Sequence, residues 1–595
     1  MAFIVKKKIN GKDYYYLNQA KRFGKKVVSK YIAYLGKDKN EAEKKAKKIL
    51  KDMEKDSKGI KMKNNIKVEN KPFSKRFPKD EMEEKSNLVK KEISVEEMAV
   101  FCKRKGFAYP SAEIYGGLAG LYDYGHLGSL LKKNFENIWR NFFLGLDDNF
   151  AEIESSEILP EKAFIASGHL KNFNDCAAKC KKGHIERADH LLEKNLKERF
   201  EGLTPEELFN KIKDNKIVCS TCGSQIEFVE VTNMMFPLQL GFANNIKTFL
   251  RPETAQSPYV NFKIQSEVMR KRLPLGLALI GRAYRNELSP RNFLLRQRAF
   301  TQAELQIFFN PSKIDEHELF DEIKDYSLIV VLSDNRDKGI QRIKCGDLLK
   351  KIPKFYVYYL AKVQQFYLDL LKFPEDKFRF YQLNDQEKAF YNKYHFDMEA
   401  NLDALGWTEI GGIHYRTDHD LKGHQEISKE NLSFFDEDTK EKFIPHVLEL
   451  SFGVDRNFYS ILNFSYYYDE KRQNIVLKLL PKLSPIKAAV FPIIKKEEFE
   501  NLSEEIVKDL KKEFNVIYDI SGSIGRRYSR NDEIGTPLCI TVDEKSVVDD
   551  SVTVRDRDTT EQIRVKIKNL KEIIKKVVEG ENILDFGKSI NTRKK

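Results

Sequence analysis

Apolar and polar positions alternate at the start of the chain and predict a small basic β/α unit over residues 1–57. Two β-prone runs flank Asn10-Gly11, a dipeptide that favours a tight hairpin, and KVVSKYIAYLG supplies a third run. A Lys/Glu-rich stretch over residues 40–55 predicts a helix after these strands. Residues 58–90 are polar and without periodicity, which is typical of a flexible linker.

A larger domain is predicted over residues 91–482. Within it, LGSLLKKNFENIWRNFF has the spacing of a helix in which one face carries Leu131, Phe135, Ile138 and Phe142. The apolar run VYYLAKVQQFYLDLLKF indicates helix, so we expect a helical insertion over about 310–400. Residues 483–595 alternate strand-like and helix-like segments, beginning AAVFPI and EEFENLSEEIVKDLKKEF, and predict a separate α/β domain.

The composition is that of a globular protein with several cores. The chain has 595 residues, 41% of them hydrophobic, but no apolar run of about 18 residues. Its first residues, MAFIVKKKIN, lack the features of a signal peptide, so we expect a cytoplasmic protein that does not span a membrane. Seven cysteines, thinly spread, argue against a disulfide framework and favour metal binding where they cluster.

Positive charge is concentrated at the N-terminus. The chain carries a formal net charge of +14, and its first 90 residues contain 27 Lys/Arg against 12 Asp/Glu. Such an excess indicates a polyanion as partner, and the three consecutive tyrosines Tyr14, Tyr15 and Tyr16 add side chains that could stack on bases. A protein-docking appendage or a solubilising tail would have the same composition.

The segment GRAYRNELSPRNFLLRQRAFTQAELQIF is a candidate hairpin with charges in a buried setting. Alternation on its first strand places Arg285 and Glu287 on one face, and Gln302 and Glu304 can share that face across the loop. Guanidinium groups match phosphate oxygens, and carboxylates can accept an amine, so a nucleotide and an amine would satisfy this set. An internal ladder of Arg–Glu ion pairs is the alternative.

Two other segments favour the nucleotide. LELSFGVDRNFYSIL predicts a strand with Glu449 and Ser451 on one face, a turn at Gly453 and a helix with Arg456 near its start. A phosphate approached by a helix N-terminus suits that arrangement. In RPETAQ, Glu253 occupies a turn beside a proline.

At this point a family resemblance emerges, which covers the chain from about Glu92 to the C-terminus. The motifs EIYGGLAGLYDYGHLG, RADHLLE, RPETAQ, GWTEIGGIHYRTDHDL, LELSFGVDR and SGSIGRRYSRNDEIGTP, together with the hairpin above, resemble the dimeric glycyl-tRNA synthetases of archaeal and eukaryotic type. These are class II aminoacyl-tRNA synthetases. The resemblance implies an α+β fold, with an antiparallel sheet flanked by helices and a C-terminal α/β anticodon-binding domain.

The resemblance also implies a reaction and its site residues. Glycine and ATP would form glycyl-adenylate, and the glycyl group would pass to the 3′ end of tRNA(Gly). Arg285 would contact the α-phosphate and the glycine carboxylate, Glu287 the adenine end, and Arg296 a further phosphate. Phe300 would stack on adenine, and Arg456 would hold the γ-phosphate with Mg²⁺. The resemblance thus implies that Arg285 and Arg456 are the catalytic residues. It also implies that the protein is a homodimer.

Glycine has no side chain to recognise, so the family solution is a small pocket of carboxylates around its ammonium group. Glu253, Glu304, Glu449 and Ser451 occupy the matching positions. Three features depart from the family pattern: His126, where proline is usual; Ala299, where an acidic residue is common; and Asp418-His419, which varies the familiar RTDYDL. We expect the change at His126 to be tolerated.

The cysteines suggest a structural zinc site within an insertion at about 170–230. Cys180, His184, Cys219 and Cys222 form a tetrahedral Cys₃His set, with Cys176 as the alternative fourth ligand. A vestigial insertion without metal is the other possibility. In the C-terminal domain, Arg526, Arg527 and Arg530, with Asp532 and Glu533, are candidates for contact with tRNA.

Two other functions fit parts of the pattern. A synthetase-like protein that only binds nucleic acid would share the architecture but would not need Arg285, Glu304 and Arg456 together. A synthetase for proline or threonine would share the fold, but the RPETAQ and ELSF segments suit a pocket of minimal volume.

Overall fold

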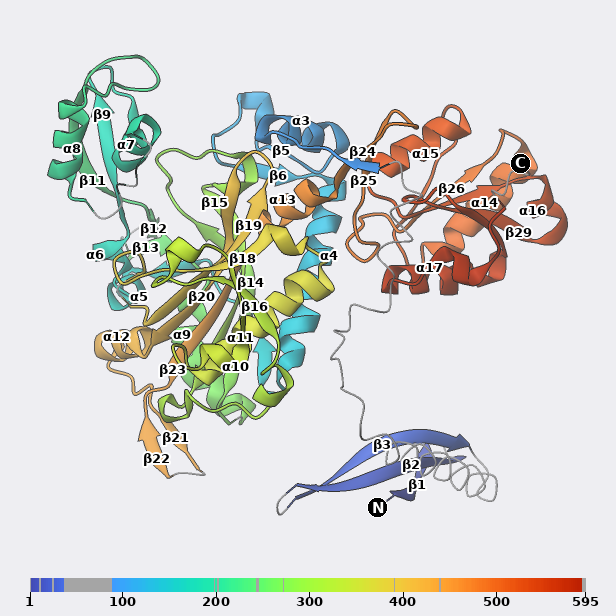
Figure 1. Cartoon of the computed structure of the whole chain (residues 1–595), viewed down its shortest axis with the longest axis horizontal. Coiled ribbons are helices and arrows are strands. Elements are labelled where there is room, and N and C mark those ends of the chain that lie inside the picture. The colour runs from blue at the N-terminus through green and yellow to red at the C-terminus, as the bar shows by residue number, and fades with distance from the viewer. Residues whose placement is uncertain are drawn as a thin grey trace. The chain divides into compact units, whose positions relative to one another are not determined.

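The computed structural model divides the chain into two units, residues 1–84 and 85–595 (Figure 1). In the first unit it describes the backbone of three strands, and in the second it describes residues 88–590 except 197, 199, 201–202, 242–245, 271, 390 and 438–439. The helix predicted over 40–55, and the predicted linker up to residue 87, lie outside the described residues.

The first unit contains an antiparallel sheet in the order β1-β2-β3. Strands β1 (Ala2–Ile9) and β2 (Lys12–Phe23) pair on either side of residues 10 and 11, with Ile9 opposite Lys12. This pairing confirms the hairpin that the Asn-Gly dipeptide predicts. Strand β3 (Lys26–Gly36) pairs with β2 along its other edge.

A nine-stranded sheet forms the centre of the second unit and is almost entirely antiparallel. Only the pairs β14/β7 and β16/β18 run parallel. In spatial order the strands are β17 (Gln341–Lys344), β16 (Ser327–Val331), β18 (Phe378–Gln382), β19 (Tyr394–Leu402), β20 (Gly406–Thr417), β23 (His446–Gly453), β15 (Ala299–Phe309), β14 (Leu275–Tyr284) and β7 (Phe150–Glu152).

One face of this sheet is apolar and packs against helices α4 (His126–Phe143), α11 (Lys354–Gln365) and α13 (Val454–Ser465). Leu305 of β15 and Leu450 of β23 face each other on it and are fully buried. On α4 the fully buried residues are Leu131, Phe135, Trp139 and Phe143. Ile138 and Phe142 are only partly buried. After Phe135, the buried positions of α4 therefore lie one residue later in the sequence than predicted.

The stretch 310–400 is not a helical insertion. It supplies strands β16, β17, β18 and β19 to the central sheet, while helix α11 packs on the sheet as part of the main core. The strands β16, β17 and β18 have only four or five residues each, and the long apolar run of α11 hides them in a pattern analysis. This stretch therefore completes the sheet and is not an addition to it.

The other face of the sheet is polar at its centre, and at one end it is covered by helices α9 (Gln256–Met269) and α12 (His419–Ser428). Because side chains alternate along β15, Gln302, Glu304 and Gln306 share this face, and Phe308 packs against Phe262 of α9. The polar face is the floor of the site.

An insertion between core strands β7 and β14 carries four of the seven cysteines, Cys176, Cys180, Cys219 and Cys222. Its strands pair in the order β10-β9-β11. Its buried apolar residues form a small core of their own, separate from the main core of the domain. The elements are β9 (Asn174–Cys180), β10 (Ile185–Arg187), α7 (Ala188–Leu196), α8 (Pro205–Asp214) and β11 (Ile226–Asn233).

The C-terminal domain is the predicted α/β unit, with a five-stranded sheet in the order β27-β26-β28-β29-β30 and its own core. Its elements are β26 (Ala488–Pro492), α14 (Glu497–Leu510), β27 (Val516–Tyr518), α15 (Ile524–Glu533), β28 (Leu538–Val542), α16 (Glu544–Asp549), β29 (Ser551–Asp556), β30 (Gln562–Lys566) and α17 (Leu570–Glu579).

Shorter elements complete the second unit. They are β4 (Leu88–Lys90), α3 (Val95–Lys105), β5 (Ala108–Pro110), β6 (Tyr122–Tyr124), β8 (Ile158–Pro160), α5 (Glu161–Ala166), α6 (His169–Asn172), β12 (Phe236–Leu240), β13 (Ile246–Leu250), α10 (Cys345–Leu348), β21 (Phe434–Asp436), β22 (Glu441–Phe443), β24 (Tyr466–Asp469) and β25 (Asn474–Leu477). His126 begins α4, and its ring packs against Gly106 at the end of α3. Among the described residues, no helix combines the length and the apolar character that crossing a membrane requires.

Candidate active site and metal centre

Three arginines line a cavity over the polar face, close to the ends of β14, β15 and β23. Arg285 follows β14, where its backbone N–H donates to the Arg298 carbonyl at 2.9 Å. Its guanidinium lies between two aromatic rings, 5.3 Å from Phe173 and 5.2 Å from Phe300. Its Nε donates to the carbonyl of Pro252. The arginine is therefore held by its surroundings in a fixed orientation.

The other two arginines each have a carboxylate partner in the same cavity. Arg296 Nε and Nη2 each lie 2.8 Å from Glu287 Oε2, and Arg456 Nη1 lies 2.9 Å from Glu409 Oε1. Arg296 and Arg456 both remain partly exposed, with about 22% and 32% of their side chains open to solvent. Ion pairs of the kind that the alternative Arg–Glu ladder requires thus exist, but they line an open cavity and do not close it.

Next to this cavity, Glu304 is buried on the polar face. The hydroxyls of Thr254 and Ser451 donate to its two oxygens at 2.6 and 2.7 Å. Burial raises the pKa of Glu304 to about 8, and the nearby carboxylates of Glu449 and Glu253 add to this effect. The surroundings of this carboxyl group therefore favour its protonated form, because no ion pair among the described residues offsets its burial.

A single buried arginine, Arg416, joins the remaining acids. Its guanidinium bonds Asp420 with two nitrogens at 2.8 and 3.0 Å, and it reaches Glu449 at 3.1 Å and Glu253 at 3.3 Å. Burial alone would raise the pKa of Glu253, but Arg416 and then His169 hold it well below the usual value. For Glu449, burial prevails and the pKa is raised.

The charges of this pocket do not balance. Arg416 contacts the carboxyl groups of Glu253, Asp420 and Glu449, whereas Glu304 has no ion pair among the described residues, and all four acids are at least 92% buried. A compact cation would relieve the repulsion among them. Sequence reasoning missed Arg416 and Asp420, although both lie in the segment GGIHYRTDHDL, where charged residues follow directly on an apolar strand.

The predicted site residues therefore fall into two adjoining groups. The cavity is lined by Arg285, Glu287, Arg296, Phe300 and Arg456. The polar face carries Glu304, Glu449 and Ser451, and Glu253 joins them from the turn before α9; Ser451 belongs to both groups. Glu409, which sequence reasoning also missed, pairs with Arg456 from strand β20.

Comparison with known proteins identifies the family. The "tRNA synthetase class II core domain (G, H, P, S and T)" matches residues 242–464, and the "Anticodon binding domain" matches residues 487–577. A glycine–tRNA ligase of Pyrococcus furiosus is 38% identical over 560 residues, which cover 80% of this chain and 98% of that protein. The chain belongs to the glycine–tRNA ligases. Another member of this glycine–tRNA ligase family, from Methanothrix thermoacetophila, is 36% identical over 564 residues, covering 82% of this chain and 97% of the relative.

Solved structures agree with the class II fold of the glycine–tRNA ligases. A prolyl-tRNA synthetase from Cryptosporidium parvum is 14% identical and matches with a TM-score of 0.50, over 84% of this chain and 79% of that one. The RNA binding domain of threonyl-tRNA synthetase from Cryptosporidium parvum is 17% identical, with a TM-score of 0.51 over 80% and 98% of the chains. At such identities the likeness is one of fold alone. The predicted α+β class with an anticodon-binding domain is thereby confirmed.

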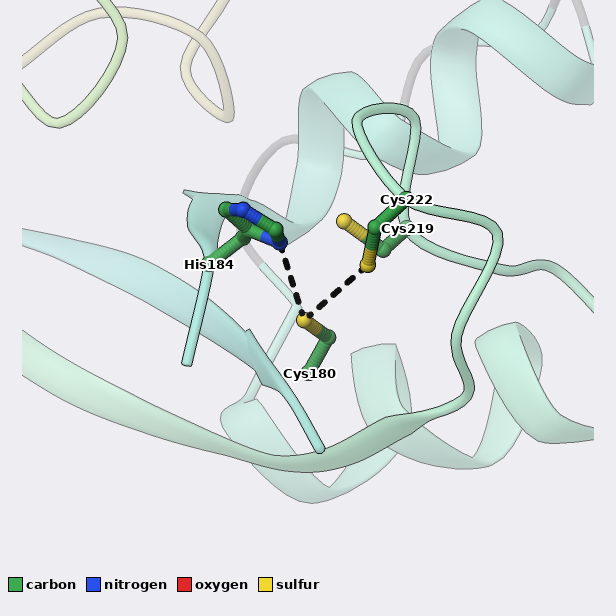
Figure 2. Close-up of side chains that lie close together, drawn as sticks. All are labelled: Cys180, His184, Cys219 and Cys222. Carbon is green, nitrogen blue, oxygen red and sulfur yellow. Dashed lines mark hydrogen bonds between the residues drawn. The ribbon is translucent and has the colours of Figure 1, made fainter. Parts of the chain in front are cut away.

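In this member of the glycine–tRNA ligase family, the insertion brings four possible metal ligands together (Figure 2). The ligand atoms of Cys180, His184, Cys219 and Cys222 all lie within 4.8 Å of one another. Cys180 Sγ is 3.7 Å from Cys222 Sγ and 3.6 Å from His184 Nδ1. Cys176 is outside this cluster, because it lies four residues before Cys180 on strand β9, about 13 Å away along the strand.

The arginines of the anticodon-binding domain differ in exposure. Arg526 and Arg530 are exposed on α15, and Arg530 pairs with Asp519 at 2.6 Å. Arg527 is 3% exposed and donates to the backbone carbonyls of Pro492 and Gly522, so the expectation that it contacts tRNA is wrong. It is instead a structural residue that joins helix α15 to the neighbouring backbone.

The two acidic candidates, at the end of helix α15, join the C-terminal domain to the preceding part of the second unit. Asp532 is fully buried and binds Arg555 at 2.9 Å and Arg472, which follows β24, at 2.6 Å. Glu533 pairs with Lys105 at the end of α3. Both carboxylates are thus engaged in ion pairs within the protein.

Proposed function

We propose that the chain is a ligase that activates glycine with ATP and transfers the glycyl group to the 3′ end of tRNA(Gly). The observation that carries the proposal is the pocket in which Glu253, Glu304, Glu449 and Asp420 outnumber one guanidinium. It adjoins a cavity lined by Arg285, Arg296 and Arg456. An amino group and a polyphosphate are the ligands that this pair of charge patterns fits.

Activation requires two anions to meet. The glycine carboxylate attacks the α-phosphorus of ATP, and a guanidinium between them stabilises the charge that develops. Arg285, held by Phe173, Phe300 and the Pro252 carbonyl, has the fixed orientation that this role needs. No general base is required, because the attacking carboxylate is already ionised.

The remaining cavity residues would place ATP. Arg296 and Arg456 would exchange their carboxylate partners for phosphate oxygens, Glu287 would meet the adenine, and the Phe300 ring would stack on it. A bound Mg²⁺ would supply positive charge that offsets the charge of the phosphates. Glu409, beside Arg456, offers the carboxylate oxygens that this ion prefers.

Glycine would place its ammonium group among Glu253, Glu304 and Glu449, with Ser451 orienting Glu304. The ammonium supplies the cation that Glu304 lacks, and three buried acids give it charge-assisted hydrogen bonds. Larger amino acids would be excluded by steric conflict. A rigid wall can discriminate more strongly than the roughly 1–3 kcal/mol that one methylene contributes by attraction.

The insertion would hold Zn²⁺ in a structural role. Two sulfur ligands on a tetrahedral zinc, each at about 2.3 Å, lie about 3.8 Å apart, which is close to the 3.7 Å between Cys180 and Cys222. His184 and Cys219 would complete the four ligands.

We also propose a homodimer in the cytoplasm that binds tRNA through Arg526 and Arg530. The turn before β6 exposes three large apolar side chains, which are 88%, 86% and 61% open at Ile114, Tyr115 and Leu118. Large apolar side chains exposed close together in sequence are consistent with an interface.

Glycine-dependent exchange of pyrophosphate into ATP tests the proposal with the purified protein. Alanine, serine, proline and threonine serve as comparison substrates. Exchange with glycine alone is the expected result. Exchange with none would favour a protein that only binds nucleic acid, and exchange with proline or threonine would favour another class II specificity.

A further inference from the structure

The cysteine-bearing insertion reaches the ATP cavity through one of its own side chains, His190. This residue lies in the first turn of α7, and its Nε2 is 3.4 Å from Arg296 Nη1. The other edge of the same guanidinium is bound to Glu287 at 2.8 Å. Arg296 is therefore held from two sides, by a carboxylate of its own hairpin and by an imidazole from a different subdomain.

The chemistry of this contact fixes the protonation of the imidazole. A guanidinium only donates hydrogen bonds, so His190 Nε2 must accept, and its proton must be on Nδ1. Burial lowers the pKa of His190 to about 3, and the charges of Arg187, Arg291 and Arg296 act in the same direction against that of Asp189. His190 is therefore a neutral acceptor over the whole working range of pH.

His190 also leaves one polar atom unsatisfied. Its Nδ1 is buried and has no hydrogen-bond partner within the described part of the chain. An unpaired buried donor lowers the stability of the protein. This cost is explained if the other ring nitrogen makes a hydrogen bond that the protein needs. The only polar group that the described contacts give to that other nitrogen is Arg296.

The base of the insertion is fixed to the same hairpin. The Phe173 ring, just before β9, stacks on the Arg285 guanidinium at 5.3 Å. On the far side of the insertion, the Met234 carbonyl accepts from the backbone N–H of Asn286 at 2.7 Å. These two contacts hold the insertion in place, so α7 presents His190 to Arg296 from a defined position.

We propose that His190 is a positioning residue for ATP, which orients Arg296 so that its guanidinium meets the nucleotide phosphates. This inference rests on the proposed function, and it assigns to the insertion a part in nucleotide binding. His190 has no contact with Glu304, Glu449 or Glu253, so its effect is confined to ATP.

Two substitutions of similar polarity separate positioning from mere packing. In H190Q the amide oxygen of glutamine extends about as far from the backbone as Nε2 of histidine, so it can accept a hydrogen bond from Arg296. In H190N the amide oxygen of asparagine extends only as far as Nδ1 of histidine, so it does not reach Arg296. We expect H190N to raise the KM for ATP about 3- to 10-fold, the effect of one hydrogen bond, with kcat and the KM for glycine within about twofold. H190Q should restore most of the loss.

Lys194→Ala is the matched control, because Lys194 is an exposed residue of the same helix. It should leave both KM values unchanged. Calorimetric titration of each full-length variant with ATP gives a second readout that needs no turnover.

The proposal is overturned if H190N binds ATP as the unmodified protein does, or if H190Q and H190N lose ATP and glycine affinity together with thermal stability. Absence of glycine-dependent exchange in the unmodified protein would instead count against the proposed function, while the ATP titration would still decide on His190.

Discussion

The Arg416 guanidinium lies 3.1 Å from the Glu449 carboxylate in the interior of the fold, where only 1% and 4% of the two side chains are exposed. The same guanidinium also binds Asp420 and Glu253. One arginine thus fixes three of the four acids of the proposed glycine pocket, and it connects β20 and β23 of the sheet to helix α12.

Replacement of Arg416 by methionine should destabilise the protein by about 3–5 kcal/mol, since it leaves buried carboxylates without their partner. Urea unfolding followed by circular dichroism measures this loss. Arg416→Lys keeps the charge but not the forked geometry, and it should recover only part of the stability. Equal stability of the methionine variant and the unmodified protein would show that the acids are neutral in the free protein.

Glu304→Gln should raise the KM for glycine at least tenfold and change the KM for ATP by less than about twofold. A neutral amide cannot balance an ammonium group, but it retains the size of the side chain. Pyrophosphate exchange with each substrate varied in turn gives both values. Glu267→Gln, at an exposed position of α9, is the matched control and should change neither. An unchanged glycine KM in Glu304→Gln would contradict the pocket.

Glycine binding should release protons near pH 7, because the pKa of Glu304 is about 8 in the free protein and an ammonium group favours the ionised form. Calorimetry in two buffers of different ionisation enthalpy counts the protons. The Glu304→Gln variant should release none through this group. A proton count of zero for the unmodified protein would mean that Glu304 is already ionised.

The same carboxyl group makes the stability of the ligand-free protein depend on pH. The folded-state pKa is raised from 4.5, so the folded form holds a proton that the unfolded form has lost. The stabilising contribution is complete below about pH 4.5 and is lost as the pH rises through about 8. Melting temperatures between pH 6 and 9 should fall less for Glu304→Gln than for the unmodified protein.

Cys222→Ser should lower the zinc content of the purified protein from one ion per chain towards none, whereas Cys176→Ser should leave it unchanged. Only the first of these thiols belongs to the four-ligand cluster. Elemental analysis by mass spectrometry measures the content. Loss of zinc in Cys176→Ser alone would reverse the ligand assignment.

Alternation along strands made much of the candidate site predictable. Gln302 and Glu304 on β15, and Glu449 and Ser451 on β23, lie on one face as the period of two requires, and the two strands are direct neighbours. Arg416 could not be found in this way. Its partners Glu253 and Glu449 are 163 and 33 residues away, and no local pattern indicates that they converge.

The sequence pattern also failed to predict which polar side chains are buried. The three arginines of SGSIGRRYSR look equivalent in sequence, yet helix α15 turns Arg527 inward to cap backbone carbonyls and leaves Arg526 on the surface. The short strands β16 to β18 were missed because four or five residues carry too little periodicity to be distinguished from loops.

The excess of acids over guanidiniums in the interior has a consequence for substrate analogues. Glycolate is as small as glycine and carries the same carboxylate, but its hydroxyl group brings no positive charge to Glu304 and Glu449. Glycolate would therefore bind weakly although it fits the pocket, because it does not offset the repulsion among the buried carboxylates. The enzyme would select the smallest amino acid by its charge as well as by its volume, so an inhibitor for this pocket would need to be cationic.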